Sequence, residues 1–155
     1  MASECHAIEV VNVDFGTTCR VVTTHGTPIL DSASRSTAIQ FQQGAPTGSA
    51  GVGRLVVSPL VVDRDGWATM CMHWLAEERE EGGPAVSAWM RGELHFLRGR
   101  GSQAAVTELL LTVRCDIGPS DRFGDDPRIR GLVDGFLAQV ARSIQERAAH
   151  IVAVG

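Results

Sequence analysis

The last quarter of the chain carries the feature that most constrains the fold, a long run of apolar residues at helical spacing. Asp126 is a good N-cap, and Pro127 suits the first helical position, where its missing N–H costs nothing. The apolar residues that recur three and four positions apart are Ile129, Leu132, Val133, Phe136, Leu137, Val140, Ile144, Ala148 and Ile151. We therefore predict one amphipathic helix over residues 127–152.

Two glycines fall within this predicted helix. Gly131 and Gly135 each weaken it by roughly 1 kcal/mol relative to alanine. We interpret them as points where a strand or a ligand comes close to the helix backbone.

The rest of the chain favours strands. The predicted strands cover residues 8–15, 19–24, 37–42, 55–62, 67–76, 86–98 and 104–117, with a short apolar piece at Ile29 and Leu30. Turns are predicted at residues 25–28 and 63–66, and an acidic loop at residues 77–83. Residues 43–53 are rich in Gly, Ala, Pro, Ser and Thr, which predicts a flexible loop or a small gate.

The two longest predicted strands each have one apolar and one polar face. In residues 86–98, Leu94 and Phe96 alternate with Glu93 and His95. One buried and one wet face is typical of antiparallel strands. The whole chain, residues 1–155, is therefore predicted to be a single α+β domain. In it, a curved antiparallel sheet of about seven strands packs on one long C-terminal helix.

Composition narrows the classes of function. A net charge of −4 and a pI of about 5.7 argue against a general nucleic-acid binder. We find no apolar run near the ~18 residues that a membrane helix needs. The four cysteines, Cys5, Cys19, Cys71 and Cys115, are scattered, and the N-terminus lacks the features of a signal peptide. We expect a cytoplasmic protein with free thiols, no cofactor and no bound metal.

The C-terminal two-thirds resembles the START-like, polyketide cyclase and lipid-transport superfamily, in which an antiparallel sheet wraps around a final long helix. The resemblance lies in residues 92–97 and 106–113, the break at Gly118 and Pro119, and the helix over residues 132–149. It implies an apolar cavity between sheet and helix that holds a small hydrophobic molecule such as a lipid or polyketide. The family normally has two short helices after its first strand, whereas residues 16–42 favour strands and turns. The alternative fold is a seven-stranded barrel with a C-terminal helix, as in pleckstrin-homology domains.

A second, local resemblance lies in residues 13–18, Val-Asp-Phe-Gly-Thr-Thr. This segment is similar to the first phosphate loop of the actin, chaperone and sugar-kinase ATPases, which joins two antiparallel strands. The second phosphate loop and the adenosine motif of those ATPases have no counterpart in this chain.

The candidate ligand-binding residues are mostly large and apolar, with adaptable methionines and tryptophans among them. They are Trp67, Met70, Met72, Trp74, Trp89, Met90, Phe96, Gly135 and Phe136. The alternative is that these side chains form an ordinary core.

The polar candidates for catalytic or metal-binding residues have weaker support in the sequence. His73 and His95 are the candidate catalytic bases, and Cys71 shares a strand face with His73 as two metal ligands would. A buried cysteine beside a hydrogen-bonded histidine is the favoured explanation of that pair. Glu93 and His95 fit a solvated face with cross-strand charge pairs.

The leading hypothesis is a small hydrophobic-ligand carrier of START-like type. One alternative is a protein–protein interaction module that uses a sheet edge or the acidic residues 77–81. Another is a cyclase-like or dehydratase-like enzyme with His73 or His95 as its base. A homodimer is compatible with each of these hypotheses.

Overall fold

A computed structural model describes residues 4–37, 54–64, 66–80, 83–100, 105–115 and 127–154. The elements follow in the order β1 (Glu4–Val11), α1 (Phe15–Thr37), β2 (Arg54–Val57), β3 (Val61–Arg64), β4 (Trp67–Glu80), β5 (Gly83–Arg98), β6 (Thr107–Cys115) and α2 (Pro127–Val154). Within these residues, neither helix is long and apolar enough to cross a membrane.

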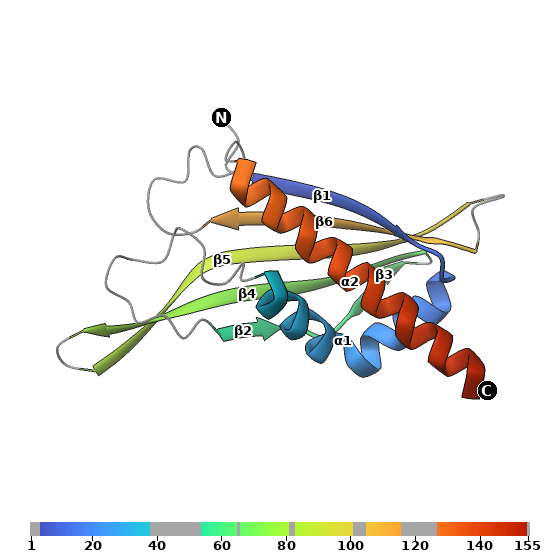
Figure 1. Ribbon diagram of the computed structural model, residues 1–155, viewed down its shortest axis with the longest axis horizontal. Coiled ribbons are helices and arrows are strands. Elements are labelled where there is room, and N and C mark those ends of the chain that lie inside the picture. Colours follow the sequence, from blue (N-terminus) through green and yellow to red (C-terminus); the bar gives the residue numbers. More distant parts are fainter. Residues whose placement is uncertain are drawn as a thin grey trace.

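All described strand pairs are antiparallel and belong to one sheet. The strand order is β1-β6-β5-β4-β2, with β3 also paired to β4, so the sheet has six strands rather than the expected seven or so. Both helices lie against the same face of this sheet (Figure 1). We call that side the covered face and the opposite side the outer face. The architecture is α+β and helix-grip-like.

The predicted C-terminal helix is confirmed as α2, which begins at Pro127 and runs for 28 residues, or about 42 Å. Asp126, its expected N-cap, lies outside the described residues. The side chains of the apolar stripe that are buried are Val133, Phe136, Leu137, Val140, Ile144 and Ala148. Leu132 and Ile151 pack at the margin of this cluster. α2 packs mainly against α1 and β1.

Helix α1 corrects the largest error of the sequence prediction. The expected strand at residues 19–24, the turn at residues 25–28 and the apolar piece at Ile29 and Leu30 all lie inside this one helix. Its buried positions include Thr18, Gly26 and Ser34, which are small or polar and complete a helical stripe with the buried valine, isoleucine and leucine side chains. The β-branched Val21 and Val22 favoured a strand locally, but burial of the whole stripe outweighs that weak preference.

Pro28 lies within α1 at an exposed position. A proline inside a helix removes one backbone hydrogen bond and commonly bends the helix, and the exposed side leaves water to satisfy the freed carbonyl. The chain therefore has helical structure after its first strand, where the resemblance to the START-like superfamily implies two short helices.

The predicted strands differ from the observed ones mainly at their ends. β1 begins earlier and ends at Val11, because Asp14 starts α1. The predicted strand over residues 55–62 is split into β2 and β3. β4 continues to Glu80 and β5 begins at Gly83, so most of the expected acidic loop is strand. A turn does lie between β3 and β4, with Gly66 at a φ of 83°, but Asp63 and Arg64 of the predicted turn are the last residues of β3. Asp65 lies outside the described residues. Residues 38–53 lie outside the described residues.

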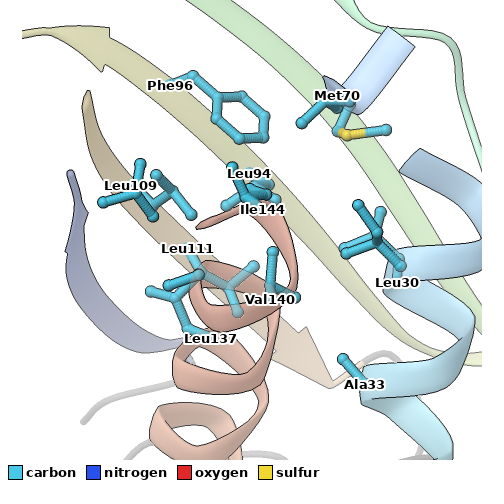
Figure 2. Packing of buried hydrophobic residues seen from close by; sticks show 14 of the residues in the cluster. Leu30, Ala33, Met70, Leu94, Phe96, Leu109, Leu111, Leu137, Val140 and Ile144 are labelled. Atoms are coloured by element: carbon cyan, nitrogen blue, oxygen red, sulfur yellow. The ribbon is translucent and has the colours of Figure 1, made fainter. Parts of the chain in front are cut away.

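The core fills the space between the covered face and the two helices (Figure 2). As predicted, Leu94 and Phe96 of β5 and Leu109, Leu111 and Val113 of β6 point into it and are fully buried. Glu93, Glu108 and Arg114 are on the outer face and exposed. The alternation confirms the expected antiparallel pattern, with one dry face and one wet face.

Close approach of a helix backbone occurs at a different glycine from the one expected. Gly131 is exposed, and a Cβ placed on it would meet nothing within 4 Å. Gly26 in α1 is buried, and a Cβ there would lie 3.4 Å from the methyl carbon of Met70 in β4. The predicted role of Gly131 is therefore wrong, and α1 crosses the sheet closely at Gly26.

Candidate functional site

The covered face holds most of the predicted ligand-binding residues. Met70 and Met72 of β4, Phe96 of β5 and Phe136 of α2 point between sheet and helices and are buried. Gly135 is half-buried beside Phe136. These residues belong to one apolar cluster with Leu30 and Ala33 of α1.

Three other candidates fall where only the backbone is described. Trp74 pairs with Met90, and the next pair joins Leu75 to Ala88, so Trp89 is the extra residue of a bulge. The side chains of Trp74, Trp89 and Met90 lie outside the described part of the structure.

Gly92 is a position without a side chain in the middle of the covered face. It is buried in β5, and it pairs with Met72 on one side and Val113 on the other. Cys5 of β1 ends the same row, because it pairs with Val113. A glycine inside a strand packs no side chain and often marks close approach of a ligand or another backbone. The alternation of Leu94 and Phe96 indicates this face from the sequence, but the pairing of Gly92 with Met72 and Val113 does not follow from it.

The first turns of α2 cross the sheet near this row. The pKa of the Cys5 thiol is raised, first by burial and then by the negative charge of Asp134, while Arg130 acts in the opposite sense. Both charged residues belong to α2, so this helix passes over the Cys5 end of the row. The helices meet near the start of α1 and the end of α2, and they diverge toward the start of α2 (Figure 1).

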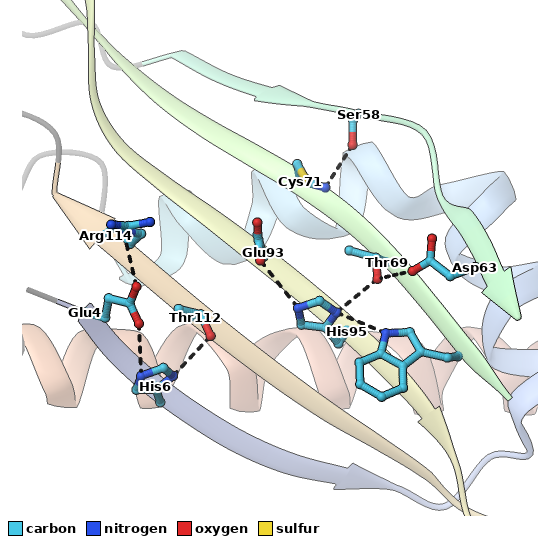
Figure 3. A network of polar contacts seen from close by, with 11 residues as sticks. Glu4, His6, Ser58, Asp63, Thr69, Cys71, Glu93, His95, Thr112 and Arg114 are labelled. Atoms are coloured by element: carbon cyan, nitrogen blue, oxygen red, sulfur yellow. Dashed lines mark hydrogen bonds and ion pairs between the residues drawn. The ribbon is translucent and has the colours of Figure 1, made fainter.

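Trp67 lies on the outer face, away from the other apolar candidates. Its indole N–H donates to Nδ1 of His95 at 3.3 Å, and the two rings meet edge to face at 5.7 Å. The Nε2 atom of His95 is 3.6 Å from a carboxylate oxygen of Glu93 (Figure 3). Because the indole can only donate, this contact requires a lone pair on Nδ1, which places the proton of a neutral ring on Nε2, toward Glu93.

Thr69 continues this outer-face network. Its hydroxyl is 3.0 Å from Nδ1 of His95 and donates to Asp63 at 2.9 Å (Figure 3). One hydroxyl proton cannot serve both acceptors at once. The Thr69 proton goes to Asp63, and Nδ1 of His95 accepts from the Trp67 indole. These hydrogen bonds fix the orientations of the Trp67 and His95 rings on the outer face.

The two candidate catalytic histidines do not reach the covered face. His95 is half-buried and His73 exposed, both on the outer face. Neither can act as a base toward a molecule held between the sheet and α2. Cys71 shares the outer face with His73, and its backbone N–H donates to the Ser58 hydroxyl at 2.8 Å. The described residues contain no group of three or more His, Cys, Asp or Glu side chains placed to hold a metal.

The Cys5 and Cys19 thiols are poor nucleophiles. Burial raises the pKa of the Cys19 thiol, as it does that of Cys5, while the positive charge of Arg98 lowers the Cys19 value. A thiol with a raised pKa stays protonated at neutral pH, and the thiolate is the reactive form. Cys5, Cys19 and Cys71 are free cysteines.

The segment similar to an ATPase phosphate loop starts a helix. A carboxylate oxygen of Asp14 accepts the backbone N–H of Thr17 at 3.0 Å, and α1 begins at Phe15. Asp14 is therefore the N-cap of α1. The expected arrangement of a loop between two antiparallel strands is wrong, because only β1 precedes it and a helix follows.

The cap has a pH dependence that can be measured. Hydrogen bonds from the Thr17 hydroxyl and backbone hold the pKa of the Asp14 carboxyl below its usual range. Because the folded-state pKa of Asp14 is below the ordinary aspartate pKa of about 3.9, the ionised carboxylate stabilises the fold at pH values above that ordinary pKa. This stabilisation is lost as the pH falls through the folded-state pKa. At neutral pH, Asp14→Ala is expected to cost about 1 kcal/mol of unfolding free energy.

Asp14→Asn is the matched control, because asparagine caps about as well without a charge. Chemical denaturation of the three proteins between neutral and acid pH measures the effect. We expect the wild-type advantage over Asp14→Asn to shrink as pH falls below about 4. An advantage that stays constant across that range would exclude the carboxylate as the group responsible.

No protein-family model and no curated protein matches the chain. Among solved structures, it is similar to TTHA0849 from Thermus thermophilus, at 13% identity and a TM-score of 0.40, over 93% of this chain and 98% of that one. It is similar to the Zhui aromatase/cyclase from Streptomyces sp. R1128, at 11% identity and a TM-score of 0.39, over 96% and 94% of the two chains.

A third similar structure is DynU16, from the dynemicin biosynthetic locus, at 13% identity and a TM-score of 0.39. The match covers 94% of this chain and 48% of DynU16, so the chain spans about half the length of that protein. The helix-grip-like layout itself is defined by the sheet order and helices of this chain.

Proposed function

We propose that this domain binds one small apolar molecule between the covered face of the sheet and helices α1 and α2. The bare position at Gly92 carries the proposal. It lies in a buried row with Met72, Val113 and Cys5, at the level where α2 begins to cross the sheet. The walls around it are apolar and include adaptable methionine, as small-molecule sites commonly do.

The positions of the polar groups in the sheet favour a binding function over a catalytic one. The catalytic candidates, His73 and His95, are on the outer face, and the buried Cys5 thiol is held protonated. The sequence resemblance implies a lipid or a polyketide as the class of ligand. Such a molecule would replace the missing side chain at Gly92 and contact Phe136 and Gly135 from the side of α2.

A substitution at Gly92 separates a ligand space from a filled core. Gly92→Leu places a large apolar side chain at the centre of the row. If the space normally holds a ligand, the variant should unfold at a denaturant concentration close to that of the ligand-free wild type and should lose binding. If protein atoms already fill the space, overpacking should cost about 1–3 kcal/mol or more.

The binding readout is fluorescence titration with N-phenylnaphthylamine, a neutral apolar probe. We expect wild-type protein to bind it and Gly92→Leu to bind it at least ten times more weakly, a difference of about 1.4 kcal/mol. Thr112→Val, on the outer face of β6, is a control that should leave binding unchanged. A destabilised Gly92→Leu variant, or a wild-type protein that does not bind the probe, would contradict the proposal.

A further inference from the structure

The outer face carries a hollow of about 850 Å³ at the end of the sheet where β3 turns into β4. Its floor is one transverse row in which each residue pairs with the next across five strands. The row consists of Val10, Glu108, Leu97, Trp67 and Arg64. Arg98 and Arg100 also line the hollow, next to Gly99 at the end of β5. A volume of this size is within the range of small-molecule pockets.

The Trp67 indole forms a flat surface of fixed orientation in the floor of the hollow. Its indole is oriented by the hydrogen bond to His95, and the guanidinium of Arg64 lies 4.9 Å from the ring centroid. Trp67 is half-buried, so part of the ring remains accessible. A pre-oriented aromatic ring with a stacked cation presents apolar area and positive charge side by side.

The charges that line the hollow are unlike those of the chain as a whole. Among the described residues, the lining includes three arginines, Arg64, Arg98 and Arg100, and one acid, Glu108, whereas the whole chain has a net charge of −4. The guanidinium of Arg98 lies 5.2 Å from the Phe15 ring centroid, toward α1. Arg64 and Arg100 are exposed and are the groups that can reach a ligand. Guanidinium groups suit oxyanions such as carboxylates and sulfonates, because two of their N–H groups can bind two oxygens of one anion.

We propose that this outer-face hollow is a second binding site, for a small aromatic anion. The aromatic body would lie against Trp67 and Leu97, and the carboxylate or sulfonate would be bound by Arg64 and Arg100. This site is on the opposite side of the sheet from the apolar space at Gly92, and it selects by charge rather than by apolar character alone. It therefore does not depend on the proposed function.

Two probes that differ by one sulfonate test this site. Anilinonaphthalene sulfonate has the body of N-phenylnaphthylamine and an added anion, so the pair isolates the contribution of charge. We expect Arg64→Gln and Arg100→Gln each to weaken binding of the sulfonate probe by roughly tenfold and to leave the neutral probe unaffected. Arg114→Gln is the matched control, since Arg114 is an exposed outer-face arginine at the other end of the sheet, where it pairs with Glu4 at 3.3 Å.

The sulfonate titration is repeated in the Gly92→Leu variant, which removes the interior site. Sulfonate binding that persists there and is lost on adding Arg64→Gln supports the outer-face site. If Arg64→Gln and Arg100→Gln behave like Arg114→Gln in the wild-type chain, the proposal is wrong whatever the Gly92 variant does. Loss of the neutral probe alone concerns the apolar space and leaves the outer-face site standing.

Discussion

Replacing Phe96 by alanine is expected to lower the free energy of unfolding by about 3–5 kcal/mol. Phe96 is fully buried at the centre of the covered face, among Met70, Leu94 and Leu109 (Figure 2). Removing the ring takes away its burial and leaves a cavity that the strands on either side cannot close. Since a domain is stabilised by only about 5–15 kcal/mol in total, this change should leave the protein near the limit of folding.

Leu97→Ala is the matched control for Phe96→Ala. Leu97 is the next residue of the same strand, but it is half-buried on the outer face. Its truncation should cost well under half as much, because part of its surface already meets water. Urea denaturation of the three proteins measures the difference. Equal losses for the two variants would contradict the assignment of the covered face as the core.

Thr107→Val is expected to cost about 1–3 kcal/mol, although the two side chains have nearly the same shape. The Thr107 hydroxyl is buried and donates to the carbonyl of Val13 at 2.7 Å. The hydroxyl of Thr18, also buried, is 3.1 Å from that of Thr107 and 3.4 Å from the same carbonyl. These three groups join the start of β6 to the turn between β1 and α1. Valine at position 107 would remove the shorter hydrogen bond to the Val13 carbonyl and leave the Thr18 hydroxyl only its 3.4 Å contact with that carbonyl.

A double-mutant cycle with Thr18→Val tests this explanation. If the cost arises from an unpaired buried hydroxyl, removing the second hydroxyl should recover part of it, so that the double variant costs less than the two single variants added together. Thr112→Val is a control from the outer face of the same strand, where the hydroxyl contacts Nδ1 of His6 at 3.1 Å in an exposed position and water can replace it. Strict additivity in the cycle would show that the two threonines do not act as a pair.

The sequence predicted α2 and the two central strands well, because their apolar residues report burial directly. Phe136, Val140 and Ile144 recur at helical spacing, and Leu94 and Phe96 alternate with charged residues, so the period in each case identifies the element. Their start and end residues were less accurate, since the sheet continues wherever a partner strand offers hydrogen bonds. The acidic Glu77 and Glu80 are strand residues for that reason.

Helix α1 could not be identified from local propensity. Its buried stripe includes Thr18, Gly26 and Ser34, which carry no hydrophobic signal in the sequence. Gly26 and Pro28 gave the signature of a turn, yet Gly26 is buried because α1 passes close to Met70. That contact joins residues far apart in the sequence, so only the packed structure explains why a small residue suits this position.

The sequence indicated the types of residue in the candidate site better than it indicated their positions in space. Met70, Met72, Phe96 and Phe136 do face one another between sheet and helices. Trp67 was grouped with them by residue type, although its odd position in β4 places it with Thr69 on the outer face. A strict alternation rule applied from Met70 would have separated it. The row that joins Gly92 to Met72 and Val113 depends on strand pairing, which no single segment reveals.

The central claim, an apolar molecule held beside Gly92, is tested most directly by native mass spectrometry of the protein isolated from its own cells. The proposal predicts that wild-type protein carries one small organic molecule per chain, which is released on denaturation and is soluble in organic solvent. It predicts that Gly92→Leu, expressed and purified in the same way, has the mass of the bare chain. A bare mass for the wild type, or the same bound molecule on Gly92→Leu, would contradict it.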